Sequence, residues 1–193
     1  LTAVAMAADR IRVGEAEVMI AGGVESMSMV PMMGHHPSMN MNIFKDENIG
    51  MAYGMGLTGE KVAQQWKISR ELQDEFALAS HQKAIAAQQA GEFSDETTAV
   101  DILERTPNLA TGQIDLHTRT ITQDEGARPD SSLAALAKLK PVFAAKGSVT
   151  AGNSSQMSDG AGAVVLMSEA AMQRFNLSPL GRFIGFSVVG VPP

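Results

Sequence analysis

The sequence predicts an α/β protein in which a long polar and helical excursion interrupts a core of helices and strands. The segment 147–167 begins with small polar residues and ends in an apolar run, 161–167, that has the length of a strand buried on both faces. The expected elements follow the order helix, strand, excursion, strand, helix, strand. A loop of tiny side chains before a strand lets another molecule approach the backbone, although an ordinary connection between two core elements explains the same pattern.

The expected core elements lie near the two ends of the chain. Residues 2–13 are rich in helix formers and almost uncharged at their start, which predicts a buried helix. Residues 18–21 predict a short buried strand that the glycine pair 22–23 closes. Further along, Ser168 is placed to cap a helix, and residues 181–191 predict a final apolar strand.

The excursion between these elements starts irregularly and then becomes helical. Residues 29–53 show neither helical nor strand periodicity, which favours a functional or interface loop. The elements expected after it are a helix capped by Thr58 and running through Gln65, a helix from Ser69 to about Gln89, small strands within 94–124 with Ile114, Leu116 and Ile121 inward, and a short helix over 130–140 capped by Asp130 or Ser131.

Composition narrows the function classes. The net charge of −6 argues against general nucleic-acid binding. Cysteine is absent, which excludes disulfides and thiolate metal sites. No apolar run is long enough to span a bilayer and no signal peptide is visible, so we expect the cytoplasm or an organelle matrix and assign the cytoplasm.

His35 and His36 are the obvious candidates for a metal site. Adjacent histidines point in different directions in regular structure, and no carboxylate or third histidine lies nearby at ligand spacing. We therefore expect two loop or interface histidines and no bound metal.

Four segments resemble the thiolase family, in that family's order. They are AGGVESMS at 21–28, MGLTGEKVAQQW at 55–66, RPDSSLAALAKLKPVF at 128–143, and the segment 147–167 with its TAGNSS and SDGA blocks. The resemblance implies a layered α/β fold in which this chain forms a partial N-terminal half interrupted by a loop domain. Residues 1–28 and 144–193 would form the partial core, and residues 29–143 the loop domain that covers coenzyme A.

The resemblance also implies the chemistry of an acyl-CoA C-acyltransferase. Thiolases cleave 3-ketoacyl-CoA with coenzyme A, or run the reverse Claisen condensation of acetyl-CoA, through an activated cysteine thiolate. In the family this cysteine precedes the helix that here begins at Leu1, and the catalytic histidine and second cysteine lie in the C-terminal half. No catalytic residue is therefore assigned to this chain. The implied partners are acyl-CoA as substrate rather than a tightly bound cofactor, the missing thiolase segments, and further copies in a dimer or tetramer.

Binding residues follow from the resemblance where its motifs match. Arg128 would lie against the nucleotide end of coenzyme A, where a planar cation suits both adenine and phosphate. The other matched positions are Leu139 and Phe143 along the adenine and pantetheine groove, Ala151 and Ser155 along pantetheine near the thioester, and Met55 beside the reacting acyl group. Gly54 and Ala135 depart from residues of some short-chain thiolases, which leaves the acyl chain length open. From the residues alone, without the resemblance, we would favour Leu139 and Phe143 as simple core.

Three interpretations remain. We favour a fragment of a catalytically ordinary thiolase. The second is a genuine short protein of thiolase ancestry that binds or regulates acyl-CoA without catalysis. The third is a structural protein that pairs through its first helix and the loop at 35–41.

Overall fold

The computed structural model describes residues 1–191, and the chain forms two compact units. Unit 1 comprises Leu1–Asn48 and Met157–Pro193, and unit 2 comprises Ile49–Gln156. The sequence placed the division after residues 28 and 143, so residues 29–48 and 144–156 group differently from that expectation. Residues 144–156 belong with unit 2 because its helices hydrogen bond to them, as described below.

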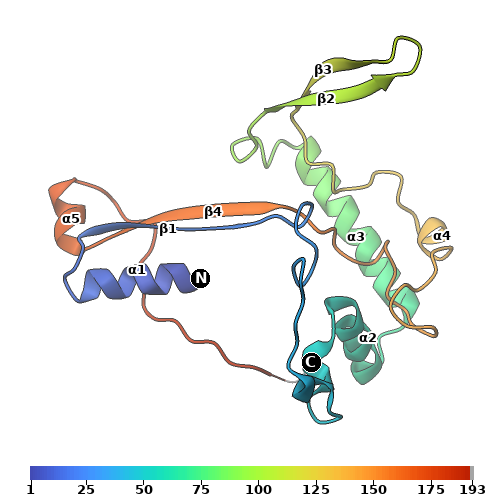
Figure 1. Cartoon of the computed structure of the whole chain (residues 1–193), viewed down its shortest axis with the longest axis horizontal. Coiled ribbons are helices and arrows are strands. Elements are labelled where there is room, and N and C mark those ends of the chain that lie inside the picture. The colour runs from blue at the N-terminus through green and yellow to red at the C-terminus, as the bar shows by residue number, and fades with distance from the viewer. Residues whose placement is uncertain (192–193) are drawn as a thin grey trace. The chain divides into compact units, whose positions relative to one another are not determined.

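Unit 1 is built on an antiparallel pair of strands (Figure 1). Strand β1, Val18–Glu25, pairs with β4, Gly160–Met167, over their whole lengths. Helix α1, Thr2–Arg12, contacts both strands, and α5, Glu169–Arg174, follows β4. The prediction that the glycine pair 22–23 ends the first strand was wrong, because β4 offers both glycines hydrogen-bonding partners and the strand continues to Glu25.

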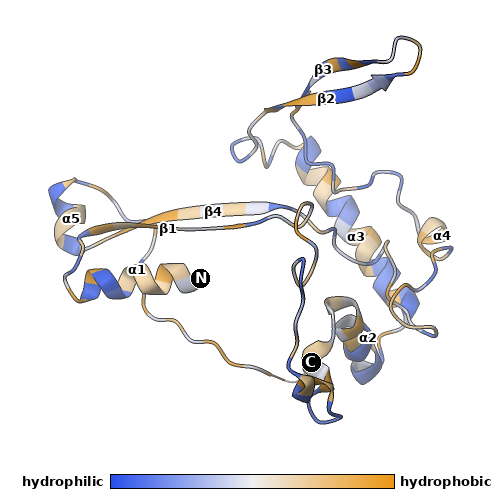
Figure 2. Cartoon of the chain, in the orientation of Figure 1, coloured by the Kyte–Doolittle hydropathy of each residue, from blue (hydrophilic) through white to orange (hydrophobic). Residues whose placement is uncertain are grey.

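The two faces of this strand pair differ. Directly opposite residues share a face and neighbours along a strand alternate. Ala21 is buried on the face against α1, whereas Ile20 is 72% exposed and Val24 is 79% exposed on the other. The expectation of a strand buried on both faces was therefore wrong for β4, whose Val165 shares the open face with Ile20. Apolar colours nevertheless run along most of β4 in Figure 2.

In unit 1, the predicted cap of α5 is confirmed, whereas the predicted burial of α1 and the strand predicted over 181–191 are not. Ser168 caps α5 through a hydrogen bond from Ala171 N (3.1 Å), and Asn176 adopts a left-handed conformation (φ 51°). Only Ala7 and Ala8 of α1 are buried, so the helix is less buried than predicted. The strand predicted over 181–191 is absent from the described residues, because no neighbouring strand offers a ladder of partners there. Instead Arg12 donates a hydrogen bond to the carbonyl of Ile184 (2.9 Å).

Unit 2 is mainly helical. Its elements are a 3₁₀ turn at Ile49–Ala52, α2 at Met55–Trp66, α3 at Arg70–Gln89, β2 at Val100–Asn108, β3 at Gln113–Ile121 and α4 at Leu133–Leu136. A further 3₁₀ turn, Met41–Phe44, lies in unit 1. These two turns are the helical structure described within 29–53, which is otherwise irregular, as expected.

The helix caps of unit 2 confirm one prediction and correct two. Ser69 caps α3, accepting a hydrogen bond from Leu72 N (3.3 Å). Gly54 rather than Thr58 is the N-cap of α2, so Thr58 lies inside the helix. Helix α4 has only four residues and is capped by Ser132 instead of Asp130 or Ser131. Asp130 does not cap it because its carboxylate pairs with Arg128.

Strands β2 and β3 form an antiparallel hairpin. Pro107 lies within β2 opposite Ile114, where a two-stranded sheet leaves an edge that tolerates its missing N–H. The predicted inward positions of Ile114 and Leu116 were wrong, since both side chains are exposed, and Ile121 is half-buried. The hairpin has no second layer among the described residues to cover that face.

The described part of the chain buries few apolar side chains. Among residues 1–191, the buried ones are Ala7, Ala8, Ala21, Ala63, Leu136 and Ala171. No described helix has the length and hydropathy needed to cross a bilayer. Each unit thus leaves apolar faces open to whatever packs against them.

Candidate functional site

The matched segment 147–155 is held against α2 by one carboxylate. Glu60, on α2, accepts hydrogen bonds from the backbone N–H groups of Ser148 (2.9 Å) and Val149 (2.9 Å) and from the Ser148 hydroxyl (3.2 Å). A Cβ atom at Gly147 would collide with the Glu60 carboxylate where it now lies, so the absence of a side chain at Gly147 leaves room for this arrangement. The carboxylate therefore fixes where the loop begins.

Asn153 organises the rest of that loop. Its Oδ1 accepts from Thr150 N (2.7 Å), and its Nδ2 donates to the Ser148 carbonyl (3.0 Å) and to Asp74 Oδ1 (3.0 Å). The Thr150 side chain is fully buried, and its Oγ1 accepts from the N–H groups of Gly152 and Asn153. The small-residue loop is thus ordered by its own side chains and tied to α3.

Asp74 links this loop to the segment around α4. Its carboxylate is buried and accepts from Arg70 Nε (2.8 Å) one helical turn earlier on α3. Arg70 in turn donates to the carbonyls of Leu136 (2.6 Å) and Leu139 (3.1 Å). One end of α3 therefore holds two segments that lie far apart in sequence.

Leu139 lies directly against the loop. A Cβ atom added at Gly152 would come within 2.5 Å of Leu139 Cδ1 and 2.6 Å of Leu136 Cδ2, so both leucines contact the bare backbone there. Gly152 stands next to Ala151 and three residues before Ser155. The structure therefore brings the Leu139 segment and the Ala151–Ser155 segment together.

Met55 and Phe143 form a second group. The ring of Phe143 packs onto the backbone of Gly56, the residue after Met55, and Val142 N donates to the Val149 carbonyl (3.2 Å). Met55 is exposed at the start of α2. Phe143 therefore reaches the helix that carries Met55, while its neighbour Val142 is joined to the loop.

Arg128 stands apart from both groups. Its guanidinium forms a two-point ion pair with Asp130, with Nε to Oδ1 at 3.3 Å and Nη2 to Oδ2 at 3.2 Å, and both side chains are about 70% exposed. The hydrogen bonds and charge of Arg128 hold the pKa of Asp130 below its ordinary value, and Asp130 raises the pKa of Arg128. The Arg128 backbone N–H donates to His81 Nδ1 on α3 (3.2 Å). The guanidinium is thus held in one plane yet open to a ligand.

An open cavity of about 810 Å³ lies within unit 2 beside these residues. It is bounded by α3, including His81, by residues 93–97 and 122–127, and by the loop at 152–156. Ser155 lines this cavity. Arg128 is not part of the lining but is the next residue in the chain after Ala127, which is. Met55, Leu139, Phe143 and Ala151 are outside that lining.

The sequence did not predict the hydrogen-bonded residues that hold the candidate binding residues in place. Glu60, Asp74 and His81 were not among the site residues predicted from the sequence. The Arg70–Asp74 spacing of four residues is a signal that indicates an ion pair on α3. No local pattern points to Ser148 or Asn153 as their partners.

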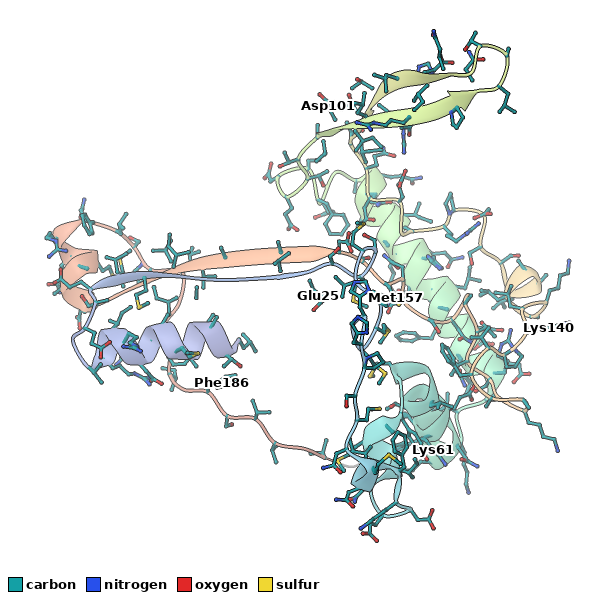
Figure 3. All side chains as sticks on the ribbon, viewed as in Figure 1. Glu25, Lys61, Asp101, Lys140, Met157 and Phe186 are labelled. Atoms are coloured by element: carbon teal, nitrogen blue, oxygen red, sulfur yellow. The ribbon has the colours of Figure 1, made fainter. Side chains whose placement is uncertain are left out.

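Lys61 and Asp101, two charged side chains outside these groups, are labelled in Figure 3. Lys61 projects from α2, with its Nζ 5.9 Å from the centre of the Tyr53 ring. Asp101 lies on the β2–β3 hairpin and accepts from the Thr120 hydroxyl (2.6 Å). Within residues 1–191, no cluster of three or more His, Cys, Asp or Glu side chains is arranged to hold a metal ion.

Helices and antiparallel strand pairs make this a mixed α/β chain. Within unit 2, the segments 55–66, 128–143 and 147–156 contact one another. The family model of the thiolase N-terminal domain matches residues 1–170. The chain belongs to the thiolase family.

Several known proteins are similar over the whole of this chain. The acetyl-CoA acetyltransferase of Rhizobium meliloti is 41% identical, and the 3-ketoacyl-CoA thiolase of Bacillus subtilis is 42% identical; the chain covers 49% of each. The crystal structure of the dimeric peroxisomal thiolase of Saccharomyces cerevisiae matches with a TM-score of 0.74 and 38% identity, over 100% of this chain and 47% of that one. The chain thus spans about half the length of the curated relatives it matches.

Proposed function

We propose that the chain is part of a thiolase-type acyl-CoA C-acyltransferase and supplies its coenzyme A-binding loop domain. The parent protein would cleave 3-ketoacyl-CoA thiolytically or condense acetyl-CoA in reverse. The observation that carries this proposal is the contact of Leu139 with Gly152, which joins two of the segments that resemble thiolases. The residues beside that contact, Ala151 and Ser155, are small and exposed, and such residues let a narrow chain such as pantetheine approach the backbone.

The proposed roles follow the binding direction of coenzyme A. Arg128 reads the nucleotide end with its planar guanidinium, which two hydrogen bonds to Asp130 orient. Leu139 and Phe143 form the apolar wall, Ala151 and Ser155 flank pantetheine, and Met55 lies beside the acyl group. The loop domain in this proposal is residues 29–143, with 1–28 and 144–193 as the partial core.

The residues of this chain bind and orient the thioester but do not attack it. The 193 residues contain no cysteine, and acyl transfer in a thiolase requires a thiolate nucleophile. The nucleophile must therefore come from outside these residues, and we expect the 193-residue polypeptide by itself to cleave no acetoacetyl-CoA.

Mass and activity measurements on the natural polypeptide test the proposal. We expect an intact mass near twice that of 193 residues, thiolytic cleavage of acetoacetyl-CoA, and direct binding of coenzyme A. Cleavage by the purified 193-residue chain, persisting after removal of contaminating full-length enzyme, would overturn the assignment of the nucleophile. A natural polypeptide that binds no coenzyme A would overturn the proposed loop-domain role.

The absence of cysteine favours one alternative, a non-catalytic acyl-CoA-binding or structural protein of thiolase ancestry. A natural polypeptide of 193 residues that binds coenzyme A without turnover would establish a non-catalytic acyl-CoA-binding protein. A natural polypeptide of this length that does not bind coenzyme A would establish a structural protein. We propose a homo-oligomer in either case, in line with the dimeric yeast structure. Relatives named for a compartment include peroxisomal and mitochondrial thiolases, so family membership is compatible with locations other than the cytoplasm expected from composition.

A further inference from the structure

We propose that Arg70, Asp74 and Asn153 act as a positioning triad that holds the segment carrying Leu139 against the loop at 150–155. This inference rests on the proposed function, because Leu139, Ala151 and Ser155 are the residues proposed to line the pantetheine passage. None of the three side chains needs to touch the ligand. Their role is to hold the two walls in register.

The first step is the burial of Asp74. Its side chain is buried in unit 2, and only 4% of the residue is exposed. A buried carboxylate must be paired and hydrogen bonded, since leaving it unpaired is strongly destabilising. Arg70 satisfies one oxygen and Asn153 the other, at 2.8 and 3.0 Å. The carboxylate therefore couples the positions of these two side chains.

The second step is that Arg70 and Asn153 each hydrogen bond to a different one of the two segments. Arg70 donates to the carbonyls of Leu136 and Leu139 at the end of α4. Asn153 accepts from Thr150 N and donates to the Ser148 carbonyl, which fixes the loop conformation. Because Arg70 and Asn153 both bond to the Asp74 carboxylate, a shift of either wall strains or breaks at least one of these hydrogen bonds.

The third step concerns how closely the two walls lie. Leu139 contacts the backbone at Gly152, so a small movement of either wall changes the position of Leu139 relative to Ala151 and Ser155. A displacement of about 1 Å at a binding site is enough to cost a large factor in productive binding. Arg70 also cannot be replaced by lysine without loss, because one ammonium does not reproduce the directed fork that bonds a carboxylate and two carbonyls.

The test measures ligand affinity in the full natural polypeptide by calorimetry, with coenzyme A and free pantetheine as the probes. Three changes are compared with the unaltered protein: Asp74→Asn, Asn153→Asp, and both together. We expect each single change to raise Kd for both probes alike, by roughly tenfold. Asn153→Asp places two carboxylates face to face, and adding Asp74→Asn restores one acid and one amide, so the double variant should recover part of the affinity.

Asp101→Asn is the matched control. It also alters a carboxylate that accepts a side-chain hydrogen bond, but in the β2–β3 hairpin (Figure 3). We expect it to leave both Kd values unchanged. Calorimetric stoichiometry separates positioning from folding, because partial unfolding lowers the number of sites whereas a displaced wall weakens every site. If Asp74→Asn does not fold, Arg70→Lys decides, with the same expected rise in Kd for both probes.

The outcomes are distinguishable. Folded single variants that bind both probes as tightly as the unaltered protein would overturn the triad and leave the proposed function standing. A loss confined to coenzyme A, with pantetheine unaffected, would also overturn it, because the triad supports the pantetheine passage. Failure of the unaltered polypeptide to bind either probe would overturn the proposed function and this inference with it.

Discussion

The ring of Phe143 occupies the space that a Cβ atom on Gly56 would fill. Its Cγ, Cδ1 and Cε1 atoms all lie closer to that position than van der Waals contact allows. Because Cγ lies at the root of the ring, a simple rotation of the ring does not relieve the overlap. The Phe143 ring, at the end of the 128–143 segment, therefore packs directly against the backbone of the first turn of α2.

Gly56→Ala should destabilise unit 2. Adding a methyl group to this contact forces Phe143 or α2 to move, and such overpacking costs about 1–3 kcal/mol, more than the helix gains from alanine. Gly59→Ala is the matched control on the same helix, since its Cβ would meet Val149 Cγ2 at an ordinary 3.5 Å. We expect it to stabilise the protein by about 0.5–1 kcal/mol. Urea unfolding of both variants in the full natural polypeptide measures the difference, and equal shifts of the same sign would contradict the packing described.

Arg128→Ala should mainly weaken recognition of the nucleotide. Because this side chain is remote from the reacting carbon, we expect KM for acyl-CoA to rise about tenfold with little change in kcat. Short acyl-pantetheine thioesters, which lack the nucleotide, should be turned over almost as before. Arg128→Lys should recover only part of the loss, since an ammonium does not stack as a plane.

Steady-state kinetics on the full natural polypeptide, with acyl-CoA and acyl-pantetheine side by side, decide the role of Arg128. An equal loss on both substrates would show that Arg128 supports the fold instead of reading the nucleotide. Its bonds to Asp130 and, through the backbone, to His81 make this comparison necessary.

Asp159 should titrate below an ordinary aspartate. The Ser28 hydroxyl (2.6 Å) and backbone N–H (2.8 Å) both donate to its carboxylate, and these bonds lower its pKa. A depressed folded-state pKa stabilises the folded chain above the unfolded value, about 3.9, and this stabilisation disappears as pH falls through the folded value. NMR titration should show the pKa of Asp159 rising in Ser28→Ala and unchanged in Ser26→Ala. A value unaltered by Ser28→Ala would contradict the importance of the hydroxyl.

The 193-residue polypeptide, expressed alone, should self-associate or pack loosely. The open face of the β1–β4 pair exposes Ile20, Val24 and Val165 together, and apolar surface of this kind is covered in stable proteins. Sedimentation velocity and thermal unfolding are the measurements. A monodisperse monomer with a sharp cooperative transition would contradict the expectation and favour a genuine short protein.

Local chemistry explains which elements were predicted well. Ser69 and Ser168 cap their helices, as predicted, through N–H groups only three residues away. The strand predicted over 181–191 failed for the opposite reason. A strand needs partners, and an apolar run alone does not provide them.

The sequence by itself determined the family resemblance, the positions of the main helices, the presence of small strands within 94–124 and the absence of cysteine from these 193 residues. These features depend on residue identity and on neighbours close along the chain. Only the tertiary structure decided that Glu60 holds Ser148, that Asp74 meets Asn153, and that β1 continues to Glu25. Those contacts join residues 79 or more positions apart or depend on a distant strand, and no periodicity or local motif encodes which distant partner will satisfy a buried polar group.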